Sequence, residues 1–262
     1  MIAIFRQYVA ARHRFITAIY VAAFASVLIS QNANATYVAA MFNENIFVIG
    51  TDSRRLSSDG RIVSDEACKI ILLNDSSAFV LMGAETWTPN NAVVPRMNFY
   101  DIARTTGAPA SLTLNAAASR FGDAVVERLN LIPPALRRPP PAIFPTIVHG
   151  VFGGLRGNTM TASSIAISYS EAFNSFGHGN AFNFVDYNKP RAFVFLDVTG
   201  EIVRSPGYKS ITDMISKIEY LIQRIIDQRL SNNIGGHPVV LVLEKGKRPR
   251  WHRGAGECPN VD

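Results

Sequence analysis

The sequence has few of the residues on which small scaffolds and metal centres depend. Its 262 residues include only two cysteines, too few for a disulfide-rich scaffold or a structural zinc cluster. Charged residues make up only 18% and hydrophobic residues 48%, a balance that excludes disorder as the dominant state. A chain of this length and composition is expected to fold around a substantial hydrophobic core.

Several common catalytic and binding motifs are also missing. The sequence contains neither a G-x-S-x-G nucleophile elbow nor a G-x-x-x-x-G-K-[ST] phosphate-binding loop. The histidines beyond the first 35 residues show no metal-ligand spacing and read as turn or core residues: His149, His178, His237 and His252. We therefore expect neither a metal nor a cofactor.

The start of the chain has the pattern of an export signal. Arg6, Arg12 and Arg14 precede an uncharged apolar run over residues 15–30, and an A-x-A step ends at Ala35. A basic segment, an apolar run and small residues at the cut are typical of a secretory signal peptide. The run has 16 residues, fewer than the roughly 20 that a membrane-spanning helix needs. An uncleaved membrane anchor and a buried helix are the alternatives.

We predict that residues 1–35 are removed and that residues 36–262 form one domain, exported to the periplasm or the extracellular space. The leader carries three arginines and no acidic residue, so its removal halves the formal net charge of +6. No basic cluster with interleaved aromatic residues remains, which disfavours a nucleic-acid partner. We expect membrane contact only transiently, through the signal peptide. Cys68 and Cys258 could pair in an oxidising compartment, but the sequence leaves this open.

Strand-like and helix-like segments alternate along the rest of the chain. Segments rich in β-branched and aromatic residues predict strands over 37–42, 46–51, 69–73, 79–83, 146–152, 164–169, 191–198, 201–204 and 238–246. Apolar residues three or four apart predict helices over 111–129 and 211–230, the second capped by Ser210. Residues 131–145 are rich in proline and predict an extended connection. The basic residues after the last strand read as a solvated edge or tail. Together these segments indicate a layered α+β domain.

Thr36 would be the first residue after signal cleavage. A threonine hydroxyl is a poor nucleophile unless a base removes its proton. The α-amine of an N-terminal threonine can act as that base, because its reference pKa of about 7.7–8.0 leaves a useful neutral fraction near pH 7. The position of the cut therefore decides whether this chemistry is available.

The segment that begins at Thr36 resembles the N-terminal part of proteasome β-subunits and of the related bacterial ATP-dependent peptidase. Asp52 follows after 16 residues in the motif TDSR, and Lys69 matches the family lysine one residue later than an ungapped count. Gly83 and Ala84 fall where the family has its oxyanion-hole glycine. The resemblance covers about 50 residues and implies an N-terminal nucleophile (Ntn) hydrolase with a four-layer αββα sandwich.

The resemblance also implies a role for each reactive residue. Thr36 Oγ would attack a carbonyl group, with its own α-amine as the base. The charge of Lys69 would lower the pKa of that amine and keep more of it neutral. Asp52 would pair with Lys69 and hold it in position.

Four further residues belong to the implied site: Gly83 as a catalytic residue, and Arg54, Ser53 and Ala84 as supporting residues. Arg54 would support Asp52 or the adjacent loop, and Ser53 belongs to the same motif. The backbone N–H of Gly83 or Ala84 would hold the developing oxyanion.

The sequence departs from the family at two supporting positions. Where the family has an Asp and then a Ser before a Gly-Gly step, an ungapped comparison places Ser231 and Ile234. The nearest candidate for the family's mid-chain Ser is Ser175.

From the predicted signal peptide and the resemblance together, we expect an exported hydrolase of peptide or small amide substrates, with an inactive scaffold protein and a small-molecule amidase as alternatives. The resemblance also implies assembly as a homo-oligomer.

Overall fold

The computed structural model describes residues 36–259 except for nine short segments: 57–60, 84–85, 88–96, 110, 139–145, 185–190, 197–198, 204–209 and 229–233. The predicted signal peptide lies outside the described residues, as does the second half of the proline-rich connection.

The first large sheet is built around the hairpin that opens the domain. Its strand order is β14-β13-β1-β2-β15-β16, and every pairing is antiparallel. The turn between β1 and β2 forms because the side-chain oxygen of Asn43 accepts hydrogen bonds from the N–H groups of Asn45 and Ile46, both at 2.9 Å. The strands are β1 (Val38–Phe42), β2 (Ile46–Asp52), β13 (Arg191–Leu196), β14 (Thr199–Val203), β15 (Pro238–Glu244) and β16 (Arg250–Arg253).

The second large sheet has the order β11-β10-β9-β6-β5, and β12 also pairs with β10. Its strands are β5 (Ile70–Asn74), β6 (Ser77–Gly83), β9 (Thr146–Arg156), β10 (Thr159–Ser170), β11 (Ser175–His178) and β12 (Phe182–Phe184). Two small sheets pair β3 (Arg55–Leu56) with β4 (Ile62–Ser64) and β7 (Thr86–Trp87) with β8 (Met97–Asn98).

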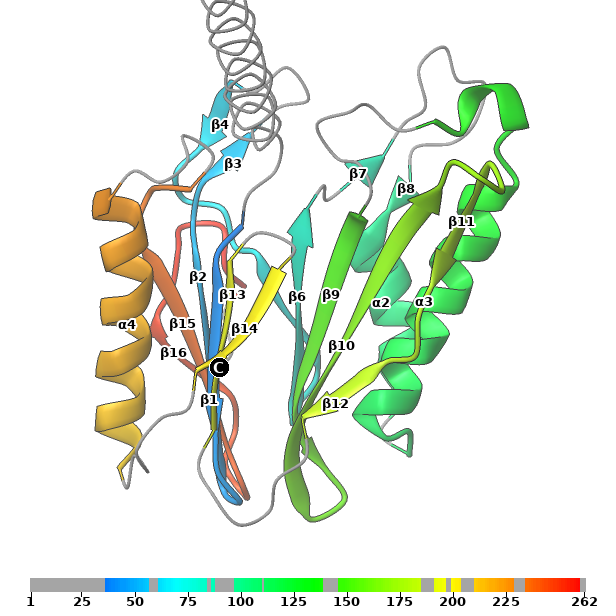
Figure 1. Cartoon of the computed structure of the whole chain (residues 1–262). Coiled ribbons are helices and arrows are strands. Elements are labelled where there is room, and N and C mark those ends of the chain that lie inside the picture. Colours follow the sequence, from blue (N-terminus) through cyan, green and yellow to red (C-terminus); the bar gives the residue numbers. More distant parts are fainter. Residues whose placement is uncertain are drawn as a thin grey trace, which may run out of the picture. The chain divides into compact units, whose positions relative to one another are not determined.

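Helices cover the outer face of each large sheet (Figure 1). Helix α4 (Ile211–Gln228) buries Met214, Ile215, Ile218 and Ile222 against the first sheet. Its N-terminus is capped as predicted, because the N–H of Asp213 donates to Ser210 Oγ at 3.1 Å. Helices α2 (Phe99–Gly107) and α3 (Leu114–Asn130) pack on the second sheet. Within the described ranges, no helix is both long and apolar enough to cross a membrane.

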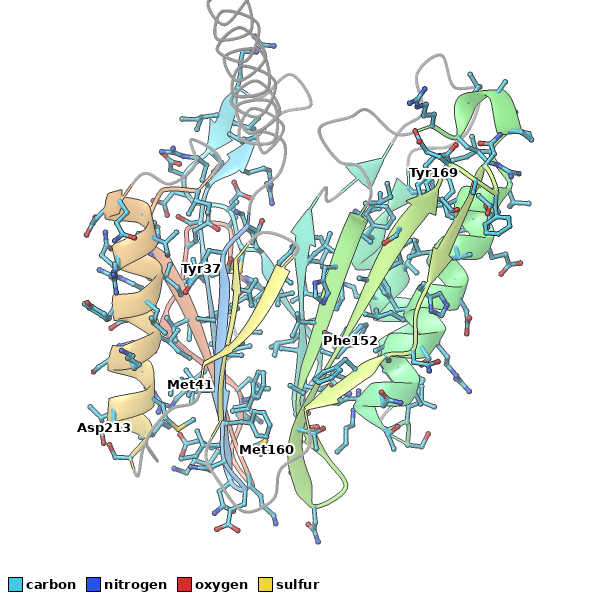
Figure 2. The ribbon with its side chains drawn as sticks, viewed as in Figure 1. Tyr37, Met41, Phe152, Met160, Tyr169 and Asp213 are labelled. Carbon is cyan, nitrogen blue, oxygen red and sulfur yellow. A yellow bond between two sulfur atoms is a disulfide. The ribbon has the colours of Figure 1, made fainter. Side chains whose placement is uncertain are left out.

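The inner faces of the two sheets pack directly on each other. Figure 2 shows Met160 between the sheets and Met41 on the α4 side of the first sheet. The contact is tight at the end of β2 that is remote from Asp52: a Cβ added to Gly153 would lie 1.9 Å from Phe47 Cζ. This packing holds strands from distant parts of the sequence in a fixed relation.

Although helices lie against the outer faces of both large sheets, the prediction of a four-layer αββα sandwich is wrong for the described residues as a whole. The described residues form a mostly antiparallel β structure, in which two small sheets accompany the large ones, and the described helices are only three, one against the first sheet and two against the second. The stretch between β2 and β5 is rich in charged and polar residues, and it pairs with itself as the exposed β3–β4 hairpin instead of joining either large sheet.

Candidate active site

Three residues that are far apart in the sequence meet at one end of the two sheets. Lys69 Nζ lies 3.3 Å from Thr36 Oγ1 and 3.0 Å from Asp52 Oδ2. All three residues are buried, with exposed fractions of 5% for Thr36, 0% for Asp52 and 6% for Lys69. The structure therefore brings together the three residues to which the resemblance assigns the chemistry.

The strands explain why these residues meet. Thr36 precedes β1, and Asp52 ends β2, so the antiparallel pairing of Val38 with Thr51 brings the start of one strand beside the end of the other. Lys69 directly precedes β5 in the second sheet. The site consequently forms only when both sheets are packed together.

Asp52 is held as a fully buried carboxylate by several hydrogen-bond donors. Its Oδ1 accepts from the N–H of Tyr37 at 3.1 Å, and its Oδ2 accepts from the N–H groups of Gly235 and Arg54, both at 3.3 Å. A buried charge is costly unless it is paired and hydrogen-bonded, and here the ammonium group of Lys69 completes the set. The Gly-Gly step noted in the sequence thus contributes a backbone hydrogen-bond donor to Asp52.

Arg54 contacts the loop beside Asp52 through its guanidinium group. Its guanidinium binds Asp65, with Nε 2.7 Å from Oδ1 and NH2 3.2 Å from Oδ2. The hydrogen bond from Arg54 lowers the pKa of the Asp65 carboxyl. The same guanidinium packs against Gly235, where an added Cβ would lie 2.3 Å from Arg54 Cζ. Arg54 therefore fixes the backbone that carries two of the donors to Asp52.

The Ser53 side chain hydrogen-bonds to the backbone on two sides of the site. Its Oγ donates to the carbonyl of Asp65 and accepts from the N–H of His237 at 2.9 Å. Gly236 adopts φ +72°, and a Cβ there would lie 2.2 Å from Ser53 Oγ. The hydroxyl thus links β2 to the Gly-Gly step before β15.

The predicted oxyanion residues are described only in part. Gly83 ends β6 with φ +107°, a conformation that favours glycine, and an added Cβ would lie 2.8 Å from the carbonyl oxygen of Ile147. Ala84 lies outside the described residues. The oxyanion role of either residue stays a prediction.

The positions at which the sequence departs from the family contribute no hydroxyl in the described residues. Ile234 is buried in the apolar cluster beneath α4, and Ser231 lies outside the described residues. Ser175 begins β11 at one edge of the second sheet, whereas Lys69 precedes β5 at the opposite edge. Ser175 is therefore not part of this group.

Two further contacts hold the site, one that sequence reasoning missed and one that it left open. Tyr100 on α2 donates its hydroxyl to the carbonyl of Lys69 at 2.8 Å, and nothing in the local pattern indicates this contact. Cys68 forms a disulfide with Cys258, 190 residues away, directly beside Lys69. The pairing that the sequence left open is thus made, and Cys68 is not a free thiol.

The chemistry of this group is that of a nucleophile beside a fixed cation. Lys69, paired with Asp52, can donate to the Thr36 hydroxyl and can stabilise negative charge that develops on its oxygen. In the described part of the chain, no group of three or more His, Cys, Asp or Glu residues is placed to hold a metal ion. Compared with protein-family models and with curated proteins, the chain has no match.

Proposed function

We propose that this protein is a hydrolase of peptide or amide bonds that uses Thr36 as an N-terminal nucleophile. The observation that carries the proposal is the buried group in which Lys69 contacts both Thr36 Oγ1 and Asp52. The resemblance to proteasome β-subunits over this segment assigns the same three residues, so sequence spacing and geometry support one reading.

The base in this proposal is the α-amine of Thr36 itself. Lys69 donates hydrogen bonds to both Asp52 Oδ2 and Thr36 Oγ1, so its geometry in this group is that of a donor. The α-amine belongs to the same residue as the hydroxyl and becomes available once the peptide bond to Ala35 is cut. The α-amine takes the proton of the hydroxyl as Oγ attacks the substrate carbonyl, and it passes that proton to the leaving amine as the C–N bond breaks. Water then hydrolyses the ester of the acyl-enzyme, which releases the carboxylic acid and restores the Thr36 hydroxyl.

Covalent labelling tests this proposal. A trileucine vinyl sulfone and the small ethyl vinyl sulfone should each add one probe per chain, mapped by mass spectrometry to the peptide that begins with Thr36. Thr36→Ala should abolish labelling, and Thr36→Ser, which keeps a hydroxyl, should retain it. Equal labelling of the wild-type protein and Thr36→Ala would refute the proposal and favour the inactive scaffold.

A further inference from the structure

Lys69 directly precedes β5, so its own backbone takes no part in the strand pairing of the second sheet. The pairing of β5 with β6 begins at Ile70, opposite Val80, and β5 is an edge strand of the second sheet. Residues 65–69 are in no strand or helix. The placement of the Lys69 backbone therefore depends on tertiary contacts of this segment.

The C-terminal segment, residues 255–259, supplies several of those contacts, and we name it the C-terminal clasp. Its disulfide joins Cys258 to Cys68, the neighbour of Lys69. The N–H of Glu257 donates to the carbonyl of Glu66 at 3.0 Å. The N–H of Gly256 donates to the Glu66 side chain at 3.0 Å. The clasp thus contacts the chain at two points shortly before Lys69, at Glu66 and at Cys68.

The clasp is itself anchored to the rest of the domain. The Glu257 carboxylate forms an ion pair with Arg55 at 2.6 Å, and Trp251 on β16 donates its ring N–H to the carbonyl of Pro259 at 2.9 Å. Since β16 pairs with β15 in the first sheet, the clasp ties the segment that leads into β5 to the sheet whose strand β1 follows Thr36.

We infer that the C-terminal clasp positions Lys69 against Thr36 and Asp52, which makes Cys258 a positioning residue for the proposed reaction. This inference rests on the proposed function. Residues 65–69 are also held by two other hydrogen bonds. The Tyr100 hydroxyl donates to the carbonyl of Lys69, and the N–H of Ala67 donates to the carbonyl of Ser53. The clasp supplies the only disulfide among the described residues, a covalent restraint that the other contacts lack.

The expected consequence of loosening the clasp is a change in the chemistry of Thr36 and not only in stability. The contact from Lys69 Nζ to Thr36 Oγ1 is 3.3 Å, so a small displacement of the ammonium removes the hydrogen bond. Displacement also weakens the effect of the positive charge on the Thr36 α-amine, whose pKa then rises. The charged groups that face Lys69 are Asp52, in contact, and Asp65, close enough to interact electrostatically.

The test measures the rate at which ethyl vinyl sulfone labels Thr36 between pH 5 and pH 9. Cys68→Ala/Cys258→Ala removes the disulfide without leaving a thiol that reacts with the probe. We expect labelling of the folded double variant to slow at least about tenfold, and its pH–rate profile to move to higher pH. Ser210→Ala is the matched control, because it lowers stability by removing the N-terminal cap of α4 and touches neither the clasp nor the interface between the sheets. This control should keep the wild-type pH–rate profile.

A second variant keeps the inference testable if the double variant does not fold. Glu66→Ala removes the exposed side chain that accepts from Gly256 and leaves the disulfide in place. It should shift the profile in the same direction by a smaller amount. Wild-type rates and profiles in the folded variants would overturn the inference alone. Absence of labelling in the wild-type protein would overturn the proposed function and the inference together.

Discussion

Replacing Lys69 with methionine tests the electrostatics of the buried group most sharply. Methionine keeps much of the length and apolar stem of lysine but removes the charge. The side chain of Lys69 is 8% exposed and that of Asp52 is 0% exposed, so neither site offers the carboxylate water as a substitute partner. The variant therefore leaves a buried negative charge without its counterion.

The size of the effect follows from what Asp52 retains. Removing one partner of a buried ion pair typically costs about 3–5 kcal/mol, because the remaining charge stays buried and uncompensated. The Asp52 carboxylate still accepts three backbone hydrogen bonds from Tyr37, Arg54 and Gly235. These donors offset part of the loss, so we expect Lys69→Met to lower the free energy of unfolding by about 3 kcal/mol.

Urea unfolding followed by circular dichroism measures this change. With a slope of about 3 kcal/mol per molar urea, the midpoint should fall by about 1 M. Lys69→Met/Asp52→Asn should be more stable than the two single effects predict, since the double variant contains no unpaired charge. A free energy of unfolding within about 0.5 kcal/mol of wild type for Lys69→Met, with strict additivity in the double variant, would refute the reasoning.

Three other predictions concern the scaffold. Ser210→Ala should lower the free energy of unfolding by about 1 kcal/mol in urea titrations, because α4 loses its N-terminal cap; an unchanged midpoint would contradict this. Gly153→Ala should destabilise the protein by about 1–3 kcal/mol because the interface has no room for a methyl group, whereas Gly177→Ala, with nothing within 4 Å of the added Cβ, should have little effect. Asp65 has a lowered pKa because Arg54 donates to it, so its stabilising contribution is present above the ordinary value of 3.8 and is lost as the pH falls through the lowered pKa. Asp65→Asn should therefore flatten the acid limb of a stability–pH profile below about pH 4, and an identical limb would count against the pair.

Much of the local structure could be predicted because the local signals were strong. The stripe of apolar residues in α3 is buried as its spacing indicates, including Leu114, Phe121 and Leu129. The hairpin that brings Thr36 beside Asp52 follows from two strand-like segments and a turn rich in asparagine. These features depend on neighbours in the sequence, which a single sequence contains.

Features that depend on distant neighbours could not be predicted in the same way. Helix α2 is only nine residues long, with two threonines near its end, and packing on the second sheet stabilises it. Residues 250–253 read as a solvated edge or tail, and they form β16, a mostly exposed edge strand whose partner β15 the local sequence does not reveal. The disulfide between Cys68 and Cys258 needs the folded chain to bring its two ends together.

The mature N-terminus is the most direct test of Thr36 as the nucleophile. The chain would be produced with its first 35 residues in a host that exports it, and the product analysed by intact mass and N-terminal sequencing. We predict that the exported protein begins at Thr36, which frees the α-amine beside the hydroxyl that Lys69 contacts. A mature protein that begins at any other residue would contradict the mechanism, because Thr36 would then have no free α-amine to act as its base.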